Sequence, residues 1–213
     1  MESKRRRGRP REYDPQQALA AALGEFRRRG YTATSLDHLS EATKMARPSL
    51  YAAFGGKLDI YRQAVRQFAD ESGARRTHAL FDEPSLHKGL EAYFGEIVDA
   101  YVTREGEPLG CPILSVISGE AAADPEIGAE LAAAVEKTDA QFQRRMRMAA
   151  DAGEISADAD VAGVAAMLAA LQHSLSLRAR AGERRPKLLR IARSHIALAL
   201  KAAGYGGFTA RSS

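Results

Sequence analysis

The chain has 213 residues, a hydrophobic fraction of 45% and a single cysteine, Cys111. This length can bury the core of one or two domains, and the apolar content is typical of a globular protein. No apolar run approaches the roughly 18 residues that cross a bilayer, and no apolar segment follows the basic N-terminus as in a signal peptide. We therefore expect a cytoplasmic protein that has no membrane partner and no internal disulfide.

The positive charge is concentrated at the N-terminus. Residues 1–11 carry six basic side chains, among them Arg5, Arg7 and Arg9, and one acidic side chain. The whole chain has a formal net charge of +4, so the remainder is close to neutral. Basic arms of this kind bind nucleic acids or other polyanions. The alternative is that the N-terminal residues form a solubilising or disordered tail. We predict that residues 1–12 form a basic, flexible arm.

Apolar residues recur at helical spacing along nearly the whole chain, and alternating strand patterns are missing, which predicts an all-α fold. The first helix begins after Asp14, a capping residue followed by Pro15, and ends at Gly30. A short second helix is expected to start at the cap Thr34. A third short helix covers residues 47–54, after a break.

A long helix begins at Lys57. Further helices are expected at about residues 85–104, 112–122, 125–152, 159–181 and 184–203. The last two combine an apolar face with many small residues, so another helix can approach them closely. We expect these two helices to form a homodimer interface, and the alternative is that they close the core of the monomer.

The first three predicted helices, two of them short and separated by a tight break, have the pattern of a helix-turn-helix module. In such a module the last short helix enters the major groove of DNA, and the helix before it crosses the backbone and fixes the angle. We predict that residues 13–57 form this DNA-binding domain. Residues 58–204 would form a helical sensor and dimerisation domain, followed by a tail at 205–213.

Residues 30–58 resemble the DNA-binding domain of the TetR family of bacterial repressors. The matching residues are Gly30, Tyr31, Thr34, Ser35, Leu36, Leu39, Ala42, Ser49, Leu50, Tyr51, Phe54, Lys57 and Leu58. The resemblance implies about nine helices, a homodimer, and a palindromic operator in double-stranded DNA as the partner. Two positions depart from the family pattern. Lys44 stands where a turn glycine is usual, and Ala46 where Ser or Thr caps the recognition helix, a loss that costs about 0.5–2 kcal/mol.

Several residues of the third helix are candidates for reading bases. Arg47 lies at the start of the helix, where a guanidinium can make a bidentate contact with guanine. Pro48, Ser49 and Ala52 can reach base edges or thymine methyl groups. The alternative for each polar residue is a solvated surface position.

Other residues are candidates for contacting phosphates. The family resemblance assigns this role to Tyr51. Thr34 and Ser35 can offer hydroxyl and backbone N–H groups at the start of the second helix, and Lys57 is placed similarly at the start of the fourth.

The N-terminal arm contains Arg7-Gly8-Arg9-Pro10, the core of an AT-hook. Arginine gains from the enhanced negative potential of a narrow A·T minor groove, and glycine lets the backbone lie close to the groove floor. We therefore predict that the arm enters the minor groove beside the major-groove site. Deleting residues 1–11 should weaken operator binding and flatten its dependence on salt.

The C-terminal region has no catalytic motif, and the five histidines lack metal-ligand spacing. We therefore expect no enzymatic activity, no cofactor and no metal. The default expectation is an apolar pocket for a small-molecule effector, whose identity the sequence leaves open. The candidate lining residues are Tyr93, Phe94, Ile97, Tyr101, Phe142, Met146 and Leu168, and the alternative is that they are plain core.

The pair Gly110-Cys111 resembles a TetR subgroup in which a Gly-Cys pair opens the sixth helix. The resemblance implies a response to electrophiles or oxidants, or to copper in some members. A thiol at a helix N-terminus is activated by the helix dipole. The alternative is that Cys111 serves only as a small, buried apolar residue.

Together these features predict a DNA-binding transcriptional regulator, a repressor that a small-molecule or thiol-reactive effector releases from its operator. Two recognition helices would have to lie about 34–36 Å apart to enter successive major grooves. The effector would stabilise a state with another separation. One alternative is an architectural DNA-binding protein without a regulatory role. A helical enzyme is the other, and it lacks convergent catalytic groups.

Overall fold

The computed structural model describes residues 13–103 and 106–206, so the N-terminal arm with Arg5, Arg7 and Arg9 lies outside the described residues. Within them the fold is all-α, as predicted. Its helices are α1 Pro15–Arg29, α2 Leu36–Thr43, α3 Arg47–Phe54, α4 Lys57–Phe81, α5 Leu86–Tyr101, α6 Leu114–Ile117, α7 Pro125–Asp151, α8 Val161–Arg180 and α9 Arg185–Ala202. In this part of the chain no helix is both long and apolar enough to cross a membrane.

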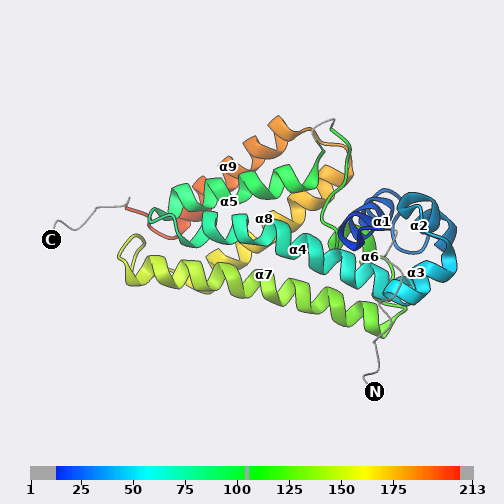
Figure 1. Ribbon diagram of the computed structural model, residues 1–213. Helices are drawn as coiled ribbons and strands as arrows, with labels where there is room; N and C mark the ends of the chain where they lie inside the picture. The colour runs from blue at the N-terminus through cyan, green and yellow to red at the C-terminus, as the bar shows by residue number, and fades with distance from the viewer. Residues whose placement is uncertain (1–12, 104–105, 207–213) are drawn as a thin grey trace, which may run out of the picture.

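Helices α1, α2 and α3 gather at one end of the molecule, and α4 runs from them along a bundle of α5, α7, α8 and α9 (Figure 1). The small end has its own apolar core, built around Phe26, Leu39 and Leu50. Ile117 of α6 and Ile127 of α7 complete that core, so the three N-terminal helices pack directly on the rest of the molecule. This packing provides a physical connection between the two halves.

The start of α2 differs from the prediction. Ser35, not Thr34, is the capping residue: its Oγ accepts the N–H of His38 at 3.2 Å, and the His38 ring accepts the N–H of Ser35 at 3.2 Å. Thr34 is fully buried, and its hydroxyl donates to the carbonyl of Gly30 at 2.7 Å. Its side chain therefore serves the turn after α1 and is not available to a phosphate.

The turn between α2 and α3 contains both departures from the family pattern. Lys44 takes the left-handed conformation, with φ 56° and ψ 27°, at the position where a glycine is usual. This conformation costs a non-glycine residue about 1–2 kcal/mol. Ala46 precedes α3 without any side-chain capping bond. The Ser40 hydroxyl, which donates to the carbonyl of Met45 at 2.5 Å, helps to hold the turn closed.

The sixth helix is much shorter than the predicted 112–122, since α6 covers only Leu114–Ile117. Contacts with the end of α1 hold this segment. The N–H of Tyr31 donates to the carbonyl of Val116 at 3.2 Å, and the Thr32 hydroxyl donates to Glu120 Oε1 at 2.7 Å. Helical periodicity does not reveal such tertiary contacts.

The far end of the bundle is closed by a buried ion pair. Arg145 of α7 and Glu154, which follows α7, are each 3% exposed and lie 3.4 Å apart. Arg145 Nε donates to the carbonyl of Leu80 at 2.8 Å, and Glu154 Oε2 accepts the N–H of Leu86 at 2.6 Å. The pair therefore joins the α4–α5 turn to the α7–α8 turn.

Candidate nucleic-acid interface and ligand cavity

Helix α3 presents one face to the core and the opposite face to solvent. Leu50 and Phe54, one turn apart, are 1% and 8% exposed and anchor the helix. The predicted DNA-contacting residues of α3 are all exposed: Arg47, Pro48, Ser49, Tyr51 and Ala52. Because the buried pair fixes the orientation of the helix, the outer face is presented as a rigid unit.

Arg47 is not free on this surface, because it forms an ion pair with Asp37 of α2. Its Nε lies 2.5 Å from Asp37 Oδ1, and both side chains are more than half exposed. The hydrogen bond between them raises the pKa of Arg47 and lowers the pKa of Asp37. Sequence reasoning missed Asp37, ten residues away, because only the angle between α2 and α3 brings the two together. A contact between Arg47 and DNA must replace this carboxylate.

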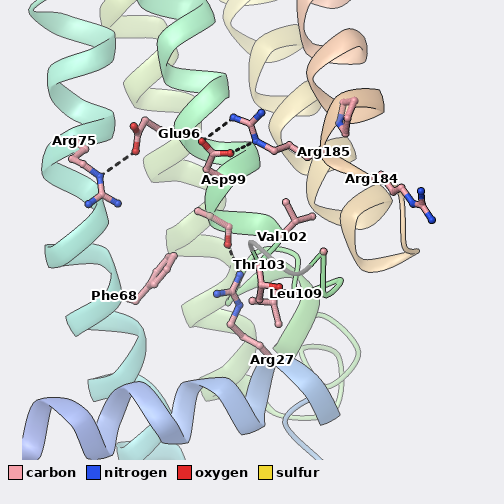
Figure 2. Close-up of a pocket in the computed structure, with 13 residues that line it drawn as sticks. Arg27, Phe68, Arg75, Glu96, Asp99, Val102, Thr103, Leu109, Arg184 and Arg185 are labelled. Carbon is pink, nitrogen blue, oxygen red and sulfur yellow. Dashed lines mark hydrogen bonds and ion pairs between the residues drawn. The ribbon is translucent and has the colours of Figure 1, made fainter.

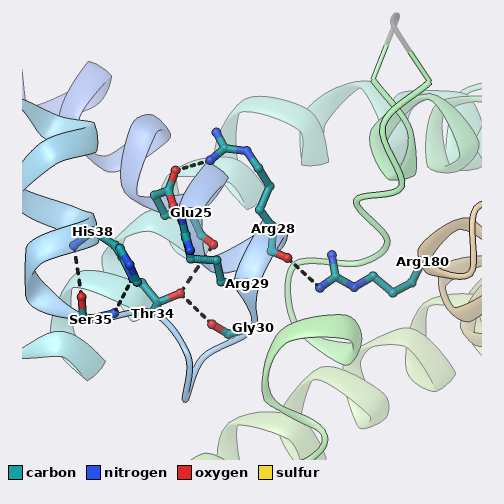
Figure 3. Close-up of polar contacts among 8 residues, drawn as sticks. All are labelled: Glu25, Arg28, Arg29, Gly30, Thr34, Ser35, His38 and Arg180. Atoms are coloured by element: carbon teal, nitrogen blue, oxygen red, sulfur yellow. Dashed lines mark hydrogen bonds and ion pairs between the residues drawn. The ribbon is translucent and has the colours of Figure 1, made fainter.

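The candidate phosphate contacts have different surroundings. Ser35 is exposed at the start of α2, as a phosphate contact requires. Lys57 is partly buried, with its Nζ 4.5 Å from the centre of the Tyr31 ring and 3.3 Å from the carbonyl oxygen of Thr32. Burial lowers the pKa of Lys57. Figure 3 shows the polar contacts around the α1–α2 turn, in which Thr34 points toward Gly30.

A cavity of about 170 Å³ lies between α4, α5, α7 and α8, next to the segment before α6. Four predicted residues line it: Tyr93, Ile97, Tyr101 and Cys111. Four others do not, namely Phe94, Phe142, Met146 and Leu168, which are fully packed core. The prediction was wrong for these four because periodicity identifies a buried face but not the place where packing leaves a gap. The lining residues that it missed include Phe68, Arg76, Gln141, Gln172 and His173.

The polar groups that line this cavity include two cationic side chains, Arg76 and Lys137, beside several uncharged ones. The hydroxyl of Tyr93 donates to Gln172 Oε1 at 2.7 Å, and burial raises the pKa of Tyr93 to about 12. Burial lowers the pKa of His173, so its ring is neutral at pH 7. A hydrogen bond from the Gln141 side chain acts against that rise in the pKa of Tyr93. The cavity therefore suits a small molecule that is mostly apolar and carries a few polar groups.

Cys111 borders the cavity but does not begin a long helix. Its N–H donates to Ser176 Oγ of α8 at 2.8 Å, and its carbonyl accepts the N–H of Ser115 at 3.0 Å. Because α6 has only four residues and begins at Leu114, its dipole gives little activation to the thiol. The structure therefore does not support the expectation that a helix dipole activates the thiol of Cys111.

A second, larger cleft of about 1050 Å³ lies between α4, α5, the end of α1 and the start of α9 (Figure 2). Four of its charged side chains form two ion pairs: Arg75 with Glu96 at 3.1 Å, and Arg185 with Asp99 at 2.5 Å. Arg27 reaches its floor from α1. Nowhere in the described ranges do three or more His, Cys, Asp or Glu side chains gather as a metal site would require.

The two halves of the chain match two known families. Residues 18–70 match "Bacterial regulatory proteins, tetR family", and residues 88–196 match "Tetracyclin repressor-like, C-terminal domain". The HTH-type transcriptional repressor ComR of Escherichia coli (strain K12) is 33% identical over 201 residues, which cover 92% of this chain and 93% of ComR. The HTH-type transcriptional repressor BdcR of the same strain is 29% identical over 110 residues, covering 52% of this chain and 55% of BdcR.

Among solved structures, the regulator CifR in complex with a 26-base-pair operator duplex has a TM-score of 0.78 and 30% identity, covering 89% of this chain and 98% of CifR. The exposed α3 face, the all-helical C-terminal bundle and these relatives define a DNA-binding transcriptional regulator. The chain belongs to the TetR family.

Proposed function

We propose that this regulator represses transcription as a homodimer bound to a palindromic operator, and that a small molecule in the cavity releases it. The exposed face of α3, held by Leu50 and Phe54, is the observation that carries this proposal. The names of ComR and BdcR as repressors and the operator complex of CifR support it. A repressor of this kind occludes its operator until the effector stabilises a conformation with lower DNA affinity.

In the proposed complex α3 lies in the major groove. Arg47 leaves Asp37 and contacts guanine, while Pro48, Ser49 and Ala52 face base edges or methyl groups. Tyr51 and Ser35 contact phosphates, and Lys57 adds positive charge beside them. The sequence-predicted minor-groove contact of the arm, through Arg5, Arg7 and Arg9, is part of the same proposal.

The DNA interface is tested with Ala52→Glu, which places a carboxylate on the exposed face of α3. Because the nearby phosphates repel that charge, operator affinity should fall at least tenfold. The matched control is Ala132→Glu on α7, also an exposed helical alanine. Fluorescence anisotropy with an operator selected from random duplexes by the wild-type protein measures both. Equal affinities for the two variants would contradict the assignment of α3.

The proposed dimer forms through α8 and α9. It uses faces of these helices other than the apolar faces that the sequence pattern predicted. The apolar residues Leu168 and Leu188 pack into the monomer core, but Met167, Leu177 and Leu198 are 49%, 60% and 59% exposed. Covering such side chains is favourable. A Leu177→Glu/Leu198→Glu variant should sediment as a monomer. A Met148→Glu control on α7 should remain a dimer.

The effector is proposed to bind the cavity beside Cys111, either reversibly or by modifying the thiol. Treating the operator complex with N-ethylmaleimide separates these two routes. If the thiol is the sensor, wild type is released and Cys111→Ser is not. Identical release of both proteins removes Cys111 from the mechanism and leaves reversible binding. Leu168, packed behind the cavity, offers a control position at which substitution changes the core without changing the lining.

A further inference from the structure

Two arginines cross between the helix-turn-helix module and the sensor, and neither is part of the DNA interface. Arg180, the last residue of α8, donates from Nη2 to the carbonyl of Arg28 at 3.0 Å (Figure 3). Its Nη1 donates to the carbonyl of Arg27. The last carbonyls of a helix have no partner within it. Arg180 therefore supplies donors and a favourable positive charge at the C-terminus of α1.

Arg27 makes the reciprocal connection from α1 to the sensor. Its Nη2 lies 2.5 Å from the carbonyl oxygen of Ala100 and 2.7 Å from that of Gly110. The residue is 7% exposed, and its guanidinium lies 5.4 Å from the centre of the Phe68 ring. Burial, with a smaller contribution from the nearby charge of Arg180, lowers the pKa of Arg27 to about 10. The cation is held by carbonyl dipoles and an aromatic face.

Both arginines hold the short segment that borders the cavity. Arg180 also donates to the carbonyl of Pro108 at 3.4 Å, and Tyr61 of α4 donates to the carbonyl of Pro112 at 2.8 Å. Gly110, between them, has a φ of +66°, and a Cβ there would lie 2.2 Å from Ser115 Oγ. The backbone of 108–112 is therefore fixed by groups that also fix α1 and α4.

We propose that Arg27 and Arg180 form an inter-domain clamp, in which Arg180 is a positioning residue that sets the orientation of the helix-turn-helix module on the sensor. The inference rests on the proposed homodimer. Because α8 carries both Arg180 and the exposed residues Met167 and Leu177, a single helix connects the dimer interface to α1. In the dimer, the clamp fixes the separation of the two recognition helices, and therefore the spacing of operator half-sites.

The test measures that separation directly. A nitroxide label at Glu41→Cys, on the exposed surface of α2, in a Cys111→Ser background gives one label per subunit, and pulsed electron paramagnetic resonance gives the distance between them. Arg180→Met should broaden or shift the distance distribution. Arg180→Lys, which retains the charge but not the planar fork, should restore it in part. Arg178→Met, on the same helix with an exposed ion pair to Glu183, is the matched control and should leave it unchanged.

A second readout uses operator duplexes with one base pair added between the half-sites. Arg180→Met should lower affinity for the selected operator about tenfold, which is the ordinary size of a coupling between two sites. The added base pair should then lower the affinity of this variant less than it lowers that of the wild type. Wild-type distances and wild-type spacing preference in folded Arg180→Met and Arg180→Lys would overturn the clamp.

Sedimentation as a monomer would instead contradict the proposed dimer. The clamp is then tested within one chain by the distance between labels at Glu41→Cys and Ala133→Cys on α7. If Arg180→Met gives the same distribution of label distances as the labelled protein with Arg180, the clamp is overturned for the monomer as well.

Discussion

The two ends of the sensor bundle are each held by a buried arginine, but the charge is balanced in different ways. At the far end, Arg145 has a carboxylate partner, Glu154, within the same buried cluster. At the end that meets the DNA-binding module, Arg27 binds the carbonyls of Ala100 and Gly110, and a second cation, Arg180, lies nearby. The first arrangement neutralises its charge and closes the fold, whereas the second spreads a charge over dipoles from several elements. The neutralised pair suits an end of the bundle that stays fixed. The contacts of Arg27 with carbonyl groups suit an end at which the DNA-binding module can change its orientation.

The far end should be the most sensitive to substitution. Arg145→Ala leaves Glu154 buried without its cation, and removing one partner of a buried pair costs about 3–5 kcal/mol. Urea denaturation should show a loss of this size in the free energy of unfolding, while operator affinity of the folded protein stays unchanged. Arg147→Ala, exposed on the same helix, is the control.

A double variant, Arg145→Met/Glu154→Gln, sharpens this expectation. With neither charge present, part of the lost stability should return, because a buried ion pair contributes little beyond its own neutralisation. A double variant less stable than Arg145→Ala would show that the hydrogen bonds to Leu80 and Leu86, and not charge balance, close this end.

The module end should show a smaller loss of stability combined with a change in function. Tyr61→Phe removes the hydroxyl that donates to the carbonyl of Pro112, and a buried unsatisfied carbonyl costs about 1–3 kcal/mol. Because the same bond connects α4 to the segment before α6, operator affinity should change as well. Tyr205→Phe, which removes a hydroxyl 3.4 Å from Ser85 Oγ at the far end of the bundle, is a control for stability alone. Unchanged operator binding by Tyr61→Phe would remove the difference between the two ends.

On the DNA-binding surface, the exposed ion pair between Arg47 and Asp37 should affect operator affinity but hardly change the free energy of unfolding. Asp37→Asn removes the carboxylate that holds Arg47, and exposed pairs contribute only about 0–1 kcal/mol. Operator affinity should rise at low salt, with a steeper dependence on salt concentration, because one negative charge beside the phosphates is lost. Glu41→Gln, on the same helix, controls for the change in net charge. If both variants gain equally, the specific contact between Asp37 and Arg47 is unimportant.

The smallest expected effect is a pH dependence in the cavity. Burial lowers the pKa of His173 below its ordinary value of 6.5, so the unfolded chain binds this proton more readily than the folded protein. Stability from His173 is therefore present above pH 6.5 and is lost as the pH falls through the folded-state pKa. Thermal unfolding of His173→Gln from pH 7.5 to 5 should show a weaker loss at acid pH than the wild type. His87→Gln, exposed on α5, should follow the wild type.

Local rules predicted most of the DNA-binding half. The N-terminal cap Asp14 and the glycine that ends the first helix, Gly30, are short-range signals, and each has the predicted role. The cap of α2 was misplaced by one residue because Thr34 and Ser35 are both good capping residues. Which of them points into the core depends on the angle at which the chain leaves α1.

The sensor was predicted less completely. Its helices were located by periodicity, but the cavity depends on which buried side chains fail to fill the space between α4, α7 and α8. Gln141 and His173 line it only because of that packing. The contacts of Arg27 and Arg180 with carbonyls are equally invisible, since a carbonyl acceptor has no sequence signature.

The sequence by itself determined the class of the protein, because helix periodicity, capping and the residues of a short recognition helix are encoded within a few turns of chain. Tertiary structure alone decided the orientation of the module, the shape of the cavity and the pairing of Arg47 with Asp37. These features join residues from 10 to 153 positions apart. Their geometry follows from the packing of whole helices, which no local pattern specifies.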